Sequence, residues 1–220
     1  MFQINYRIVE NEDELKKMTK EAYDEEWGNI EGLLELCFNE SSYGYMYDGE
    51  INPEMLAVGC FQDELLVSWF HNLLEAVVAL REVEHITVCE MECPKMLEFQ
   101  KRDEFLEVRE IDEMDDKKSK VRFYKKFKVQ SMGRPIVQRG IPRRLVELKS
   151  GEAFTKGIEV CETDFIKTII LHHEFEQEVI KKAQQFVTDV EEKFPHLVMS
   201  RTLIRLRESI HKAEQCIKHT

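Results

Sequence analysis

The chain has one cluster of histidine and acidic side chains that could bind a metal or transfer protons: His172, His173, Glu174 and Glu176. On a helix, His172 and Glu176 are four residues apart and share a face. Two such ligands can begin a metal site, but a zinc site needs three or four, and the zinc-protease pattern His-Glu-x-x-His is missing. The sequence therefore favours ordinary helix-surface residues here, and it predicts no bound metal or cofactor.

A catalytic site would have to be assembled from residues that are far apart in the sequence. His71 lies beside the apolar stripe of a predicted helix, but no neighbouring nucleophile or acid identifies a catalytic partner. Phosphate-binding glycine loops, the Gly-x-Ser-x-Gly elbow and the kinase motifs are all missing. The contributors would be His71, Cys89, His172, His173 and Glu176, and we do not expect them to converge. An enzyme without a recognisable motif is a less favoured alternative.

The distribution of charge is the strongest signal in the sequence. The net formal charge of the 220 residues is −12. Residues 1–116 contain 30 Asp and Glu but 9 Lys and Arg, whereas residues 117–220 contain 13 Asp and Glu and 22 Lys and Arg. Such asymmetry points to charged partners, or to one half of the chain covering the other.

Acidic residues are concentrated between positions 104 and 116. A solvated surface is the ordinary interpretation, but an acidic field of this kind also speeds association with a basic protein and orients it. We predict a non-enzymatic protein that docks a basic partner through this segment. The predicted contacts are Glu104, Glu107, Glu110, Asp112, Glu113, Asp115 and Asp116.

The segment 117–149 is strongly basic, with 12 Lys and Arg and a single acid, Glu147. Basic strands with interleaved aromatic residues occur in nucleic-acid-binding proteins. The negative charge of the whole chain would repel a polyanion, so we expect these cations to meet the acidic half within one fold. Binding of nucleic acid, or of another acidic partner, is the alternative.

An α+β fold follows from the apolar pattern, with one antiparallel sheet packed on a central helix and a C-terminal helical hairpin. The central helix is predicted over 63–82, where apolar residues recur at three- and four-residue steps. Short linkers separate the strand-like runs after it, which makes an antiparallel meander the economical topology. The predicted strands cover 2–9, 30–38, 86–93, 96–100, 105–111, 121–129 and 158–161.

Two helices are predicted at the C-terminus, one over 164–194 and one that begins at Ser200, with Pro195 as the break between them. We accordingly divide the chain into a sheet domain, 1–160, and a helical hairpin, 161–220, packed together as one unit. The first helix would be about 45 Å long, which is more than a small sheet covers. We expect it to bend, or to offer part of its face to a partner or to a second copy of the chain.

Between the predicted strands and the central helix lies a segment rich in Ser, Tyr, Gly and Asp. Its alternating tyrosines, Tyr43, Tyr45 and Tyr47, have two interpretations. They are core-packing residues, or they belong to a partner-binding loop, because tyrosine is a common anchor of protein interfaces.

The cysteine pattern and the hydropathy favour a cytoplasmic protein without membrane contact. Six cysteines are scattered without a Cys-x-x-Cys pair, which favours reduced thiols over a disulfide framework. The first ten residues lack the basic start and the apolar run of a signal peptide. The longest apolar stretch, 65–80, contains several polar residues and is shorter than the roughly 20 apolar residues that span a bilayer.

The layout of residues 1–190, with an N-terminal strand, a central helix and strands after it, resembles bacterial immunity proteins of polymorphic toxin systems. The nearest local match is the helical stretch Trp-Phe-His-Asn-Leu-Leu-Glu-Ala at 69–76, which is similar to helices placed before a sheet in several of these families. The basic segment 117–149 departs from the pattern of a uniformly acidic inhibitor. The resemblance implies binding rather than catalysis, with a co-encoded toxin as the basic partner.

Overall fold

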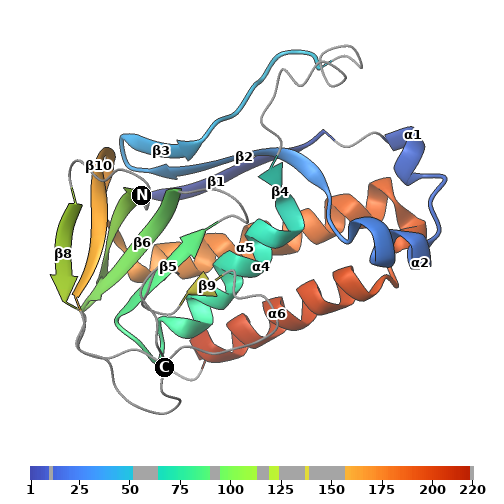
Figure 1. The fold of residues 1–220 in the computed structure, drawn as a ribbon. Helices are drawn as coiled ribbons and strands as arrows, with labels where there is room; N and C mark the ends of the chain where they lie inside the picture. Colours follow the sequence, from blue (N-terminus) through green and yellow to red (C-terminus); the bar gives the residue numbers. More distant parts are fainter. Residues whose placement is uncertain are drawn as a thin grey trace.

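The computed structural model describes residues 1–9, 12–51, 64–89, 95–112, 119–123, 137–138 and 157–218. The fold is α+β, with two antiparallel sheets and a C-terminal pair of helices (Figure 1). The predicted class and the C-terminal helix pair are therefore confirmed. The single predicted sheet is replaced by two.

The first sheet is built around β2 (Glu31–Phe38), which pairs with β1 (Phe2–Ile8), β3 (Ser41–Gly44) and β4 (Glu64–Leu65). Alternating apolar residues bring Phe2 opposite Phe38 and place both in the core. The connection from β1 to β2 contains three short helical elements. These are α1 (Glu12–Leu15), α2 (Lys20–Ala22) and the π-helix η1 (Tyr23–Trp27).

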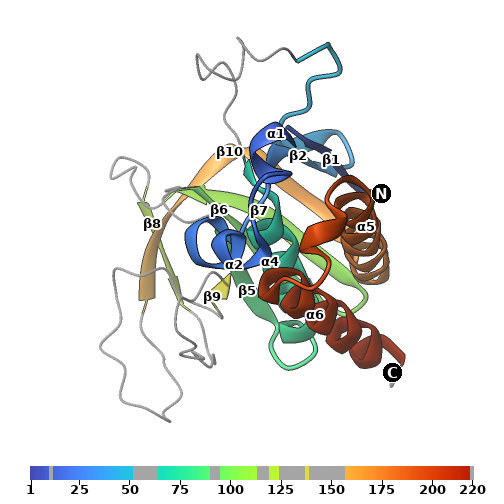
Figure 2. The ribbon, with the colours of Figure 1, turned by 90° about the vertical axis from the view of Figure 1, so that its right-hand side faces the viewer.

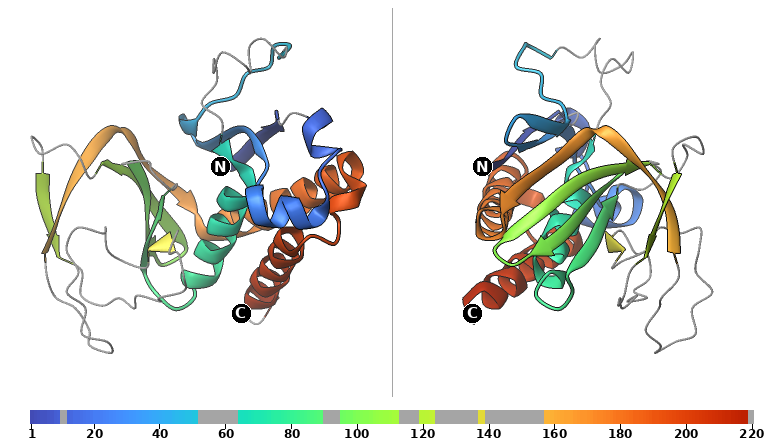
Figure 3. Two further views of the ribbon diagram at one scale, coloured as in Figure 1. Left: turned by 45° about the vertical axis from the view of Figure 1, so that its right-hand side comes forward. Right: turned by 90° about the vertical axis from the view of Figure 1, so that its left-hand side faces the viewer.

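The second sheet has six strands in the order β8-β10-β7-β6-β5-β9. Consecutive strands β5, β6 and β7 form the predicted antiparallel meander, but β10 lies between β7 and β8. The arched course of β10 beyond β7 is visible in Figure 3. The strands are β5 (His85–Cys89), β6 (Lys95–Arg102), β7 (Phe105–Asp112), β8 (Ser119–Phe123), β9 (Val137–Gln138) and β10 (Gly157–Leu171).

The helical layer consists of α4 (Leu66–Ala79), α5 (His172–Lys193), the 3-10 turn η3 (Pro195–Leu197) and α6 (Arg201–Lys218). Figure 2 looks along this layer, with α4, α5 and α6 side by side. The central helix α4 is buried along most of its length, and the ring of Phe70 stacks on Phe186 of α5 with centroids 4.8 Å apart.

One aromatic cluster joins the two sheets to α5. The ring of Phe2 lies 5.1 Å from Phe38 and 5.2 Å from Phe175, and the ring of Phe99 in β6 lies 5.0 Å from Phe175. Burial of each such ring stabilises the fold by roughly 1.5–3 kcal/mol. The buried residues form one core that extends from β1 to α6, so the sheet and helical parts pack as a single unit.

The predicted start of the first C-terminal helix is wrong. Residues 164–171 belong to β10, and α5 begins at His172. The predicted boundary between residues 160 and 161 therefore falls inside a strand. The helix α5 has 22 residues, whereas 31 were predicted. It does not extend beyond the rest of the fold, because residues along it from His172 to Val190 are buried. The argument from helix length for a second copy of the chain no longer applies.

Among the described residues, none of the helices has the length and apolar character that crossing a membrane requires.

Candidate partner-binding surface

The turn between β6 and β7 brings exposed acidic residues to one end of the six-stranded sheet. Arg102 pairs with Phe105, so Asp103 and Glu104 form a two-residue turn, and Asp103 has a positive φ of 54°. The carbonyl of Glu104 accepts a hydrogen bond of 2.8 Å from the amide of His172, which ties the turn to the start of α5. The side chains of Asp103 and Glu104 are both exposed.

An apolar group lies beside this turn. Phe105 is opposite Leu171 and Glu107 is opposite Ile169, so Phe105 and Ile169 are diagonal neighbours on one face of the sheet. They are 40% and 60% exposed. Since buried positions are the norm for such side chains, their exposure on adjacent strands needs an explanation.

Asn39 ties the first sheet to this end of β10. The amide of Asn39 donates to the carbonyl of Met1 at 3.0 Å, and its side chain donates to the carbonyl of Ile169 at 3.0 Å. Phe105 and Ile169 are two of the six large apolar residues exposed in the described part. We call Asp103, Glu104, Phe105 and Ile169 the hairpin surface.

The hairpin surface combines an apolar centre with acidic residues at one edge. Glu84, also exposed, extends the acidic edge, because its carbonyl accepts a hydrogen bond from the amide of Lys101 near the same turn. Arg102 and Lys167 are exposed cations on the sheet face beside the apolar centre. An apolar centre with a charged rim is the usual anatomy of a protein interface.

The seven predicted contact residues lie in different environments. Glu104 is exposed on the hairpin surface, whereas Glu107 is partly buried and bound to Arg109. Glu110 is 5% exposed, because it pairs with Leu97 and follows Val108 on the apolar face of β7. The prediction that Glu110 contacts a partner is therefore wrong. Asp112 ends β7, and the remaining three predicted contacts, Glu113, Asp115 and Asp116, lie outside the described residues.

A buried charged network lies deeper on the same sheet face as Phe105 and Ile169. The Nε2 of His85 is 2.9 Å from the Oε1 of Glu98, and the Oε2 of Glu98 is 4.0 Å from Arg109. Glu98 is only 1% exposed. Glu98 and Arg109 are opposite one another on β6 and β7, so their contact is a cross-strand pair that supports the register of these strands. Sequence analysis missed this pairing, which was visible only once the register was known.

The histidine and acid cluster of α5 forms a second buried network. Glu176 is 4% exposed and binds Arg81 from the turn after α4, with distances of 2.7 and 2.8 Å to its two carboxylate oxygens. The Nε2 of His172 lies 3.2 Å from the same carboxylate. The prediction that these are helix-surface residues is therefore wrong for both His172 and Glu176. His173 is exposed.

Burial sets the protonation states of this second network. Burial and the nearby cations of Lys101 and Arg81 lower the pKa of His172 to about 4, so its imidazole is neutral near pH 7. Burial also raises the pKa of Glu176, although the Arg81 guanidinium works in the opposite direction. A neutral histidine next to a carboxylate held by arginine is suited to structural support.

The other residues considered for catalysis do not join His172 and Glu176. His71 lies on α4, ten residues before Arg81 in the sequence, and its Nδ1 is 3.1 Å from the hydroxyl of Ser209 on α6. Cys89 ends β5. Within the described ranges, no three His, Cys, Asp or Glu side chains are arranged to hold a metal ion.

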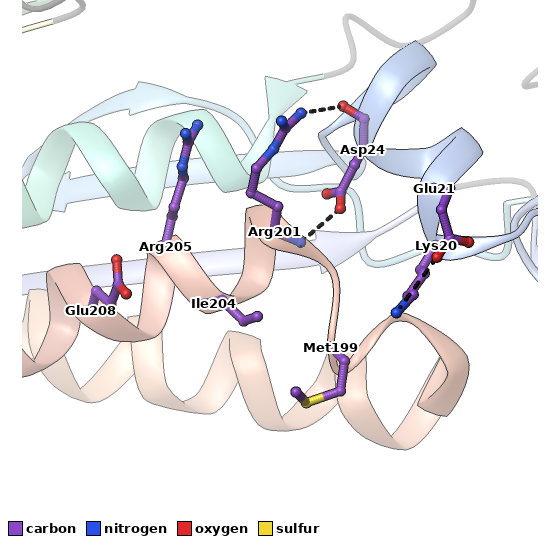
Figure 4. A pocket seen from close by; sticks show the side chains of 8 residues that line it. All are labelled: Lys20, Glu21, Asp24, Met199, Arg201, Ile204, Arg205 and Glu208. Atoms are coloured by element: carbon purple, nitrogen blue, oxygen red, sulfur yellow. Dashed lines mark hydrogen bonds and ion pairs between the residues drawn. The ribbon is translucent and has the colours of Figure 1, made fainter.

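A shallow pocket of about 410 Å³ lies between α2, η1 and the start of α6 (Figure 4). Its key contact is Asp24, whose carboxylate accepts hydrogen bonds from the amides of Arg201 at 2.7 Å and Thr202 at 3.0 Å. Partial burial works in the opposite direction, but these hydrogen bonds lower the pKa of Asp24. Because Asp24 already occupies the free amides of the helix terminus, the pocket has a structural explanation.

Replacing Asp24 with alanine should lower the free energy of unfolding by about 1–2 kcal/mol, because the first two amides of α6, those of Arg201 and Thr202, would lose their acceptor. Urea denaturation of the two proteins measures the difference. Glu21, an exposed acid in the same pocket, provides the control, and Glu21→Ala should change stability by less than about 0.5 kcal/mol. Equal effects of the two substitutions would contradict a capping role for Asp24.

Comparison with known proteins gave no relative. No protein-family model matches the chain, and no curated protein or solved structure matches it either.

Proposed function

We propose that this protein is a non-enzymatic binding protein that docks a basic partner protein through the hairpin surface, in the manner of an immunity protein that neutralises a co-encoded toxin. The observation that carries the proposal is the exposed apolar group beside the exposed acids of the β6–β7 turn. We place the protein in the cytoplasm because its scattered cysteines favour reduced thiols over a disulfide framework.

The two kinds of side chain would have separate roles. Phe105 and Ile169 are anchors that a partner desolvates, which slows dissociation. Asp103 and Glu104 attract a basic surface and orient it, which speeds association. Both roles gain from a rigid support, and the turn is held by its hydrogen bond to His172 and by pairing on both sides of β7.

The test begins with capture of binding proteins from the native host by the full chain and identification of any captured protein. With the purified partner, Asp103→Lys combined with Glu104→Lys should reduce the association rate about tenfold at low salt and flatten its dependence on salt. Ile169→Ser should weaken affinity about tenfold, mainly through faster dissociation. Surface plasmon resonance resolves the two rates.

Two matched controls isolate the surface. Glu192→Lys combined with Glu208→Lys changes the net charge equally at exposed positions elsewhere, and Met199→Ser removes an apolar side chain that is 65% exposed. Both controls should leave binding within about twofold of the wild type. A captured partner that is not basic, or hairpin variants that behave like the controls, would overturn the proposal.

A further inference from the structure

The hairpin surface lies on the face of the six-stranded sheet that is turned away from the helices, which we call the outer face. Leu106 and Val108 of β7 are buried on the opposite face, so the residues that alternate with them point outward. In the right-hand view of Figure 3 the strands β6, β7 and β10 lie in front of the helical layer. Phe105 and Ile169 on the outer face are 40% and 60% exposed, so their apolar surface is open to a partner.

Charged and apolar side chains follow one another in a fixed order on the outer face. Asp103 and Glu104 form the turn, and Phe105 is the next residue. Ile169 of β10 is diagonal to Phe105 and farther from the turn. Lys167 is two residues farther along β10, about 7 Å beyond Ile169. The order along this line is therefore acid, apolar, apolar, cation.

The charges at both ends of the line have no partner within the described part of the chain. The side chains of Asp103, Glu104 and Lys167 are exposed, and none of them makes an ion pair or a hydrogen bond there. By contrast, Glu107 and Arg109 on the same face bind each other. The two ends thus carry unpaired charges of opposite sign, separated by an apolar centre.

We infer that a second copy of this chain docks on the outer face. A two-fold axis parallel to this face, crossing the line between Phe105 and Ile169, reverses the order of the groups along it. Phe105 of each copy then meets Ile169 of the other, and the turn acids of each copy meet Lys167 of the other. Opposite charges thus face each other at both ends, as an interface between two identical surfaces requires. Arg102, the other exposed cation of the face, is on β6 and lies to one side of the line.

This dimer goes beyond the proposed function. It uses the sheet and not the C-terminal helices, and it forms without any other protein. Because it covers the hairpin surface, a basic partner would have to displace the second copy. An interface this small should be weak, since stable interfaces bury about 800 Å² per partner, and we expect a Kd of about 100 µM.

Sedimentation velocity of the full chain measures the self-association. Between about 5 and about 500 µM protein at about 150 mM salt, the weight-average sedimentation coefficient should rise about 1.3-fold, as such a Kd requires. Ile169→Ser should remove the rise, because its apolar contact occurs twice in the dimer. Met199→Ser, at an exposed apolar residue elsewhere, should keep it.

An exchange of charges tests the pairing itself. Lys167→Glu places acids opposite acids, and Asp103→Lys combined with Glu104→Lys places cations opposite cations. Each of these two proteins should therefore remain monomeric by itself. An equimolar mixture of the two should recover the concentration-dependent rise, because acid meets cation at both ends of the mixed dimer.

The control variants carry the same charge changes at exposed positions of α5 and α6. Lys218→Glu, and Glu192→Lys combined with Glu208→Lys, should self-associate like the wild type. A wild type that stays monomeric at all concentrations, or a mixture no heavier than its two components, would overturn the dimer. Since these measurements contain no other protein, the capture of a basic partner tests the proposed function independently.

Discussion

Replacing Arg81 with alanine should lower the free energy of unfolding by about 3 kcal/mol, one of the largest effects expected for a side chain outside the apolar core. The substitution would leave the carboxylate of Glu176, which is 4% exposed, without the guanidinium that touches both of its oxygens. Removing one partner of a buried ion pair commonly costs about 3–5 kcal/mol. The lower end applies here, since Glu176 can take up a proton instead. Urea denaturation at pH 7 measures the loss.

A double variant distinguishes the ion pair from simple loss of packing. Arg81→Met combined with Glu176→Met replaces both charges with apolar chains, and this pair should recover most of the stability. Arg102→Ala, at an exposed arginine near the same end of the sheet, should cost less than about 0.5 kcal/mol. If Arg81→Ala proved as mild as Arg102→Ala, Glu176 would have to be solvated in solution.

Acidification should destabilise the protein through His172, and His172→Gln should remove that part of the pH dependence. The folded state holds the pKa of His172 at about 4, below the ordinary value of 6.5. The unfolded chain therefore takes up a proton as the pH falls through 6.5, whereas the folded chain does not until about pH 4. Stability from this group is fully present above pH 6.5 and is lost below it, by about 2 kcal/mol between pH 7 and pH 5.

The test compares how steeply the free energy of unfolding changes with pH in the wild type and in His172→Gln. The pKa of Glu176 is raised, so this group stabilises the folded protein as the pH falls, opposite to His172. Glu176 is present in both the wild type and His172→Gln. Urea denaturation of the wild type and of His172→Gln at several pH values between 7 and 5 gives the difference. His173→Gln, at the exposed neighbour, should follow the wild type. Parallel pH profiles for the wild type and His172→Gln would show that His172 titrates normally.

Local patterns predicted the elements whose neighbours lie close in the sequence. The spacing of apolar residues identified α4, and alternation with short linkers identified β1, β2 and the meander β5–β7. The second half of β10, from residue 164, was mistaken for a helix because Phe165, Ile169 and Ile170 fit a helical stripe that continues into α5. Pairing with β7 and β8 decides in favour of a strand, and such long-range pairing is not encoded in the local period.

The same error hid the apolar centre of the hairpin surface. As a helical residue, Ile169 belonged to a buried stripe, but as a strand residue opposite Glu107 it faces outward. The exposure of Glu104 could be predicted from the sequence, because turn residues are exposed. Glu110 could have been excluded, since Leu106 and Val108 set an alternation that places it on the apolar face. In the two buried networks, Arg81 binds Glu176, and His85 binds Glu98, across more than ten positions of the sequence, and no local motif predicts these contacts.

The position of β10 between β7 and β8 has a consequence for synthesis of the chain. The strands up to Asp112 leave the ribosome before residue 171 is added, and at about 5–20 residues per second this interval lasts roughly 3–12 s. During that time β7 has an unpaired edge that can template pairing with other chains. The ring of Phe2 likewise lacks its neighbour Phe175 until α5 has been synthesised. Nascent chains of this protein should therefore depend on chaperones until β10 and α5 emerge, and slow translation of residues 113–171 should increase aggregation.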